Sequence, residues 1–213
     1  MVQSVKKCII KNTKEVIFIK KLKYLLLPLV ILLVTLLPMT VLGTSKSPNV
    51  FMLGDSRFVG MKSYDSDDNH FYYAKVGEGY NYFKKTWNTV KNYVTDGDYV
   101  VINFGVNDLG NIDRYIELIN QISTETNAKI IFMTVNPVDE YTESKHGYSV
   151  KNSKIDDFNK RISQETNDNV YIVNTNSYLT KNGFQSPDGV HFSKETYINI
   201  LEYLNSYLDN FEE

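Results

Sequence analysis

Two parts of the sequence hold residue types that work together in hydrolytic enzymes. Asp188 precedes His191 by three residues, within the segment 186–192. An acid and a histidine on one loop can supply two members of a hydrolytic triad, in which the carboxylate orients the imidazole. The nucleophile must then come from elsewhere, and the candidate is Ser56, which follows the apolar run 50–53. This combination predicts serine ester chemistry.

Histidine is the expected base. A serine hydroxyl is a poor nucleophile until a base takes its proton, and histidine, with an unperturbed pKa of about 6.5, takes and returns a proton near neutrality. The chain has three histidines. His70 lies in a polar stretch before an expected strand and His146 in the polar segment 143–147, and neither belongs to a motif with an acid. We therefore expect both at the surface and assign the base to His191.

The apolar pattern predicts the elements that position these residues. Five short runs rich in β-branched and aromatic residues are the expected strands, at 49–53, 71–76, 99–104, 129–135 and 170–174. Most are continuous apolar runs, which is typical of parallel strands covered on both faces. Apolar residues at three- and four-residue steps predict helices within 80–94, 112–122, 155–162 and about 194–208. We expect an α/β fold: a flavodoxin-like, three-layer α/β/α sandwich with a mostly parallel five-stranded sheet.

Three segments follow expected strands directly: Gly54-Asp55-Ser56, Gly77 and Gly105-Val106-Asn107-Asp108. Open α/β sheets bind ligands at the carboxyl ends of their strands, so these segments should converge on one rim. The polar segment 139–152 is expected to form a long loop over that rim.

In order and placement, these motifs and Asp188-Gly189-Val190-His191 resemble those of the SGNH hydrolases, also called the GDSL esterase/lipase family. The resemblance covers about Asn49 to the C-terminus. It implies that Ser56 is the nucleophile, that His191 is the general base and acid, and that Asp188 orients the imidazole. It also implies an oxyanion hole made by the backbone N–H of Ser56, the backbone N–H of a glycine and the side-chain amide of Asn107. Gly77 is the expected glycine and Gly79 the alternative, and no cofactor is expected.

Arg57 departs from the family pattern, which often has Leu or Ile after Gly-Asp-Ser. A guanidinium beside the nucleophile would either favour anionic substrates or pair with Asp55 or with an acid in the loop. We expect the pairing.

Other polar and aromatic clusters give weaker signals. Asp65, Asp67 and Asp68 lack the spaced ligands and the turn glycine of a calcium loop, so we expect a solvated loop and no metal site. Tyr141 and Tyr148, in the expected rim loop, are expected in the core or on a neutral surface, and stacking on a sugar is the alternative.

The first 45 residues differ from the rest. The segment 24–45 carries no charge and is long enough to span a membrane. The leader 1–23 before it holds seven lysines and one acid, Glu15. The positive-inside rule then places the leader in the cytoplasm and the domain 46–213 outside. We expect an uncleaved anchor, since the apolar run exceeds an ordinary signal core, and a signal cleaved near Val41-Leu42-Gly43 is the alternative. The single cysteine, Cys8, lies in the leader, so no disulfide is expected in the domain.

The charge of the expected domain is acidic. Seven of the 23 basic residues and one of the 25 acidic residues lie in the leader, which leaves 16 basic and 24 acidic residues, a formal charge of −8. A polyanion requires a basic face, so nucleic acid is not an expected partner.

The sequence thus predicts an extracytoplasmic, membrane-tethered serine esterase. Its expected substrates are small acyl esters, above all acetyl groups on cell-surface glycans, an expectation that rests on location. Two alternatives stay open: an O-acyltransferase that uses the same triad, and a catalytically silent glycan-binding module.

Overall fold

The computed structural model describes residues 47–211, so the predicted leader and the predicted membrane segment lie outside the described residues. Within 47–211, no helix has both the length and the apolar character needed to cross a membrane.

Five parallel strands form one sheet in the order β2-β1-β3-β4-β5. The strands are β1 (Val50–Gly54), β2 (His70–Ala74), β3 (Tyr99–Asn103), β4 (Lys129–Met133) and β5 (Val170–Val173). All five agree with the expected strands to within two residues at each end. Because β1 lies between β2 and β3, the segments that follow β2 and β3 flank the segment that follows β1.

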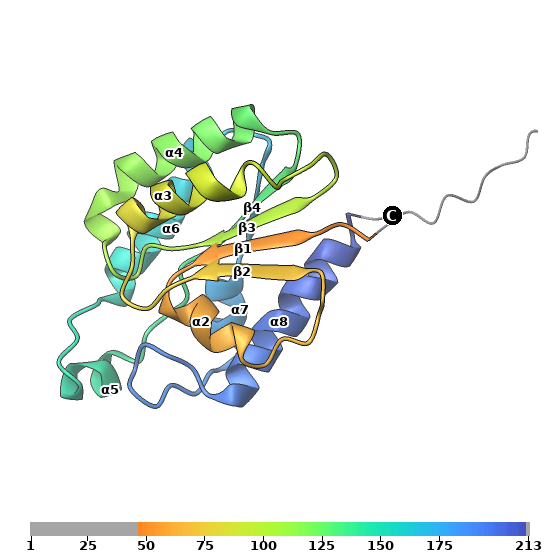
Figure 1. The fold of residues 1–213 in the computed structure, drawn as a ribbon. Coiled ribbons are helices and arrows are strands. Elements are labelled where there is room, and N and C mark those ends of the chain that lie inside the picture. The colour runs from red at the N-terminus through yellow and green to blue at the C-terminus, as the bar shows by residue number, and fades with distance from the viewer. Residues whose placement is uncertain (1–46, 212–213) are drawn as a thin grey trace, which may run out of the picture. The chain divides into compact units, whose positions relative to one another are not determined.

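Helices cover both faces of the sheet, which confirms the three-layer fold (Figure 1). One layer holds α3 (Tyr80–Val90), α4 (Ile112–Glu125) and α6 (Asn152–Glu165), and the other holds α2 (Ser56–Lys62), α7 (Thr175–Asn182) and α8 (Lys194–Asp209). A short 3-10 helix, η1 (Leu109–Asn111), leads into α4, and α5 (Glu140–Lys145) lies beyond β4.

The two cores explain why the strands are apolar throughout. Phe51 and Leu53 of β1 pack with α3, α4 and α6, whereas Val50 and Met52 pack with α2 and α8. Side chains alternate between the faces of a strand, so a strand covered on both sides needs apolar residues at every position.

The expected long loop at 139–152 is only partly a loop. Asp139 caps α5, because its side chain accepts hydrogen bonds from the backbone N–H groups of Tyr141 and Thr142. The next helix, α6, already begins at Asn152. A short polar helix held by its cap has no apolar stripe, so the periodicity of the sequence does not reveal it.

The expectation for His70 and for the Asp65 loop is wrong in part. The His70 side chain is only 4% exposed, and its Nδ1 lies 2.6 Å from Oδ2 of Asp65, which also accepts a hydrogen bond from the Tyr72 hydroxyl. Burial alone would raise the pKa of Asp65, but these two hydrogen bonds, the hydrogen bond from the Asp67 backbone N–H and the charge of His70 together lower that pKa. Asp67 and Asp68 are exposed as expected, and so is His146. The residues 47–211 hold no cluster of three metal-ligating side chains.

Candidate active site

Ser56 lies just beyond the carboxyl end of β1. It is the first residue of α2 and follows β1 after Asp55 alone. Asp55 is the N-cap of this helix, and its carboxylate accepts a hydrogen bond from the backbone N–H of Arg57 at 2.9 Å. Ser56 is 7% exposed, so the fold holds its hydroxyl at the rim and largely shields it from water.

His191 and Asp188 complete a hydrogen-bonded chain with Ser56. The Nε2 atom of His191 lies 2.8 Å from the Ser56 hydroxyl oxygen. On the other side of the ring, Nδ1 lies 2.6 Å from Oδ2 of Asp188. Both distances are within hydrogen-bond reach, so the structure brings together the three residues that the sequence singled out.

Local hydrogen bonds shape the loop that carries the acid and the histidine. Oδ1 of Asp188 accepts hydrogen bonds from the backbone N–H groups of Val190 at 2.9 Å and His191 at 2.7 Å. Partial burial alone would raise the pKa of Asp188, but the hydrogen bonds from the His191 ring and from these two N–H groups lower it. Asp188 therefore favours its charged form, which suits a group that orients an imidazole.

Two of the segments expected to form the oxyanion hole contact each other. Nδ2 of Asn107, after β3, donates a hydrogen bond to the backbone oxygen of Glu78, after β2, at 2.8 Å. Asn107 is exposed, and its amide has a second N–H available. Both candidate glycines, Gly77 and Gly79, flank Glu78, so both remain candidates.

Asp108 fixes the turn that contains these glycines, a role that the sequence analysis missed. Its carboxylate accepts hydrogen bonds from the backbone N–H of Tyr80 at 2.9 Å and from the Tyr115 hydroxyl at 2.6 Å. A Cβ atom at Gly79 would collide with this carboxylate, so only glycine permits the close approach. The one available signal was that Asp108 directly follows Asn107.

Arg57 does not form the ion pair that the sequence predicted, although the charge of Asp55 acts on it. It is 2% exposed, and its guanidinium donates to the backbone oxygens of Val190, Asn136 and Pro137. Among the described residues it forms no salt bridge with a carboxylate, and its burial leaves it no surface for an anionic substrate. The three acceptors are backbone oxygens, which no sequence motif records.

Asp55, two residues before Arg57, is also buried, and the charge of Arg57 acts on its carboxyl group. Burial raises the pKa of Asp55 to about 6, although the charge of Arg57 and the hydrogen bond from the Arg57 backbone N–H act against this rise. Burial also lowers the pKa of Arg57, and Asp55 counteracts that shift.

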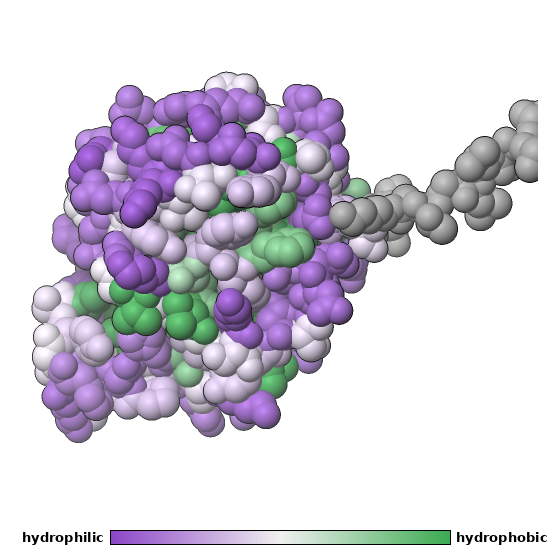
Figure 2. Space-filling view, viewed as in Figure 1, coloured by the Kyte–Doolittle hydropathy of each residue, from purple (hydrophilic) through white to green (hydrophobic). Residues whose placement is uncertain are grey.

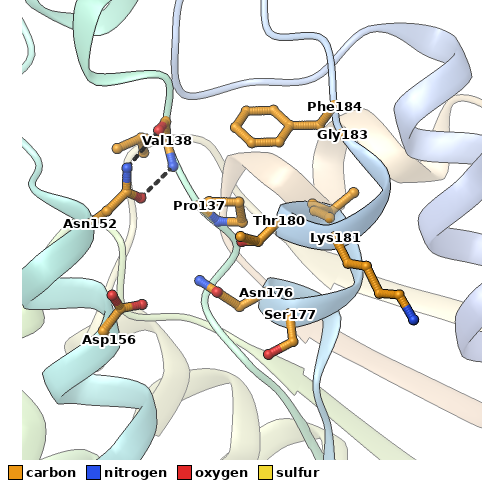
Figure 3. A pocket seen from close by; sticks show the side chains of 11 residues that line it. Pro137, Val138, Asn152, Asp156, Asn176, Ser177, Thr180, Lys181, Gly183 and Phe184 are labelled. Atoms are coloured by element: carbon orange, nitrogen blue, oxygen red, sulfur yellow. Dashed lines mark hydrogen bonds between the residues drawn. The ribbon is translucent and has the colours of Figure 1, made fainter.

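Two cavities open near the rim. One, of about 630 Å³, lies between α6 and α7 and holds none of the triad residues (Figure 3). There the side chain of Asn152 makes two hydrogen bonds with the backbone of Val138, and Lys181 points away from both. The other, of about 480 Å³, is lined by Asn107, by apolar side chains that include Leu109 and Phe158, and by charged ones that include Lys154 and Arg161.

The surface beside the rim is mixed. Figure 2 shows that hydrophilic side chains cover most of this face and that hydrophobic ones gather near the carboxyl end of β2. Val76, which follows β2, is 65% exposed. Tyr141 and Tyr148 are also exposed, so neither belongs to the core.

Comparisons with known structures show the same fold in several hydrolases. A lipase/acylhydrolase from Enterococcus faecalis is 16% identical, with a TM-score of 0.59 over 76% of this chain and 96% of that one. A GDSL-like lipase from Bacteroides thetaiotaomicron is 20% identical, with a TM-score of 0.63 over 77% and 89%. A variant of an acetyl xylan esterase from Geobacillus stearothermophilus is 15% identical, with a TM-score of 0.52 over 72% and 90%. No curated protein matches this sequence.

A family model supplies the decisive comparison. The model described as GDSL-like lipase/acylhydrolase matches residues 60–204, about two thirds of the chain. The match includes Asn107, Asp188 and His191 and begins shortly after Ser56. The chain therefore belongs to the GDSL-like lipase/acylhydrolase family and is a serine hydrolase.

Proposed function

We propose that the protein is an extracytoplasmic esterase that removes small acyl groups, above all acetyl, through Ser56, His191 and Asp188. The hydrogen-bonded chain from the Ser56 hydroxyl through His191 to Asp188 carries this proposal, with its distances of 2.8 and 2.6 Å. It supplies a nucleophile, a base and an orienting acid in contact with one another.

The proposed reaction has two halves. Nε2 of His191 takes the proton from Ser56 as the serine oxygen attacks the ester carbonyl, and the imidazolium then protonates the leaving alcohol. This leaves an acyl-serine. His191 next takes a proton from water, whose oxygen attacks the acyl-serine, and returns a proton to Ser56 as the carboxylic acid leaves. Asp188 stabilises the imidazolium in both halves.

The negative oxygen of each tetrahedral intermediate requires donors that are in place beforehand. We assign this task to the backbone N–H of Ser56, the free N–H of the Asn107 amide and the backbone N–H of Gly77, with Gly79 as the alternative glycine. As the first residue of α2, Ser56 has a backbone N–H with no partner inside the helix. The bond between Asn107 and Glu78 supports this assignment, since it holds the amide beside the glycine turn.

The preference for acylated glycans rests on two observations. Tyr141 and Tyr148, in the segment 139–152, are 71% and 42% exposed, and each offers an aromatic surface for a sugar ring, although Lys145 lies over one face of Tyr141. One similar structure is that of an acetyl xylan esterase. The extracytoplasmic location rests on the lysine-rich leader and on the uncharged segment 24–45.

Hydrolysis of aryl esters tests the proposal. The purified full chain should cleave an aryl acetate, with kcat/KM falling as the acyl chain lengthens. Ser56→Ala should lose nearly all activity, and a variant that combines Ser56→Ala with His191→Ala should be little worse, because the triad acts as a unit. Wild-type turnover in Ser56→Ala would refute the nucleophile assignment. Transfer of acetyl to a sugar hydroxyl in preference to water would indicate an acyltransferase instead.

A further inference from the structure

Arg57 joins three segments that meet beneath the candidate active site. Its Nε donates to the Val190 oxygen at 3.1 Å, its Nη1 to the Asn136 oxygen at 2.8 Å and its Nη2 to the Pro137 oxygen at 3.3 Å. Asn136 and Pro137 follow β4, and Val190 lies between Asp188 and His191. One side chain next to Ser56 therefore contacts the loop that carries the other two triad residues.

The guanidinium also contacts the residue after His191. Its central carbon lies 5.2 Å from the centre of the Phe192 ring, a distance suited to a cation–π contact. Phe192 is 5% exposed and Val190 is 4% exposed. The residues on both sides of His191 are thus buried against Arg57, which restricts how the backbone at His191 can move.

A second contact holds the same loop from the side of α5. The backbone N–H of Asp139 donates to the Gly189 oxygen at 2.9 Å, and the loop that leads to α8 passes beside α5 (Figure 1). Two consecutive backbone oxygens, those of Gly189 and Val190, are therefore held by different elements. Of these two contacts, only the one made by Arg57 comes from a side chain, so only that one can be removed by a side-chain substitution.

The chemistry of arginine fits this task and that of lysine does not. A guanidinium presents its donors in a rigid planar fork, whereas an ammonium is a compact point charge that is more strongly hydrated. Each of the three guanidinium nitrogens has its own acceptor, which a single ammonium nitrogen cannot reproduce. Burial of a cation is costly unless hydrogen bonds and a counter-charge compensate, and here Asp55 supplies the counter-charge.

We propose that Arg57 is a positioning residue: it holds the Asp188–His191 loop so that the His191 ring stays within hydrogen-bond reach of Ser56. The residue contacts no substrate, because it is buried beneath the rim. The proposal rests on the proposed function for its kinetic consequence, but its structural consequence can be measured without any substrate.

Arg57→Lys and Arg57→Gln are the test variants. The lysine variant would keep the charge and lose the fork, and the glutamine variant would keep one pair of donors and lose the charge. Both should let the His191 ring drift from Ser56, and misplacement of a catalytic group by about 1 Å can cost about 100-fold in rate. The matched control is Ile122→Ala. Ile122 is fully buried near the end of α4, just before the chain enters the amino end of β4. The substitution destabilises the fold away from the rim.

Two measurements on the full chain decide the question. The first is kcat and KM for an aryl acetate. The second is the downfield proton resonance of the hydrogen bond between Nδ1 of His191 and Asp188, which reports the loop directly. In the folded variants, kcat should fall about 10- to 100-fold with KM within about threefold of wild type, and the resonance should broaden or disappear. Ile122→Ala should keep the kinetic constants of the wild type and its downfield resonance.

The outcomes separate the alternatives. If Arg57→Lys folds and keeps both kcat and the resonance, the positioning role is wrong. It is equally wrong if only KM changes, if kcat falls no further than in Ile122→Ala, or if neither Arg57 variant folds. If the wild type hydrolyses no ester, the proposed function fails, and the resonance alone then decides the role of Arg57.

Discussion

Asp55 is a buried carboxyl next to the candidate nucleophile, and it makes stability depend on pH. Burial raises its pKa from 3.8 to about 6 in the folded protein. Between these values the folded protein holds a proton that the unfolded chain has released, so the free energy of unfolding falls as pH rises. The fall amounts to at most about 3 kcal/mol.

The substitution Asp55→Asn should remove this pH dependence. Asparagine caps a helix about as well as aspartate, so the bond to the Arg57 backbone N–H can persist. Urea unfolding between about pH 4 and about pH 7 should show the difference in stability, wild type minus variant, falling with pH. Parallel curves for the two proteins would mean that Asp55 does not titrate in this range.

At the scale of the elements, Asp108 connects α3, η1 and α4. It accepts hydrogen bonds from the Tyr80 backbone N–H, from the Asn111 side chain and from the Tyr115 hydroxyl. Asp108→Ala should lower the free energy of unfolding by about 3 kcal/mol, because it leaves the buried Tyr115 hydroxyl and the Tyr80 N–H unpaired. It should also lower kcat, since the turn beside Asn107 loses its support.

The control for Asp108 is Tyr115→Phe, which removes only one of these bonds. It should cost about 1 kcal/mol and leave kcat nearly unchanged. Urea unfolding and ester hydrolysis measure both effects. Equal losses in the two variants would show that the bonds to Tyr80 and Asn111 contribute nothing.

Glu143, in α5, is a fully buried acid, and neither of its carboxylate oxygens has a hydrogen-bond partner among the described residues. The backbone of Glu143 packs closely against Gly189: a Cβ atom added at Gly189 would collide with the backbone nitrogen of Glu143. An unpaired buried carboxyl is costly, so Glu143→Met should raise the free energy of unfolding by about 1–2 kcal/mol.

The exposed Glu117 provides the control for Glu143. Glu117→Met should change stability by less than about 0.5 kcal/mol, as surface substitutions usually do. Thermal or urea unfolding checks both variants. A loss of stability in Glu143→Met would indicate that the carboxylate is bound by a partner, such as a cation.

The elements differ in how well the sequence predicts them. The five strands are predictable because both faces are buried, which makes each strand a continuous apolar run. The helices α5 and α7 are not, since caps such as Asp139 and Asn174 begin them and they carry few buried apolar residues. The contact between His70 and Asp65 was missed because an acid five residues before a histidine is no recognisable motif.

Within the site, the triad was predictable and its supports were not. Ser56, Asp188 and His191 belong to short motifs, and the order of those motifs indicates that they meet. Arg57 donates its side-chain hydrogen bonds only to backbone oxygens, which every residue has, so its role depends on the packing of segments far apart in the sequence.

At the scale of the whole molecule, the leader and the uncharged segment 24–45 predict an anchored protein with its domain outside the cell. The full-length protein should stay in the membrane fraction after a high-salt wash, because an apolar span is held by the hydrophobic effect and not by charge. External protease should reach the domain in intact cells. A soluble form whose N-terminus begins near Thr44 would identify the segment as a cleaved signal instead.

The central claim is that Ser56 is a nucleophile activated by His191. A fluorophosphonate, which phosphonylates activated serines, followed by peptide mass mapping of the full chain, tests this claim most directly. The account predicts one phosphonyl group per chain, on Ser56, with much slower labelling in His191→Ala and none in Ser56→Ala. Labelling of Ser56→Ala at the wild-type rate, or labelling of the wild type at another residue, would contradict it.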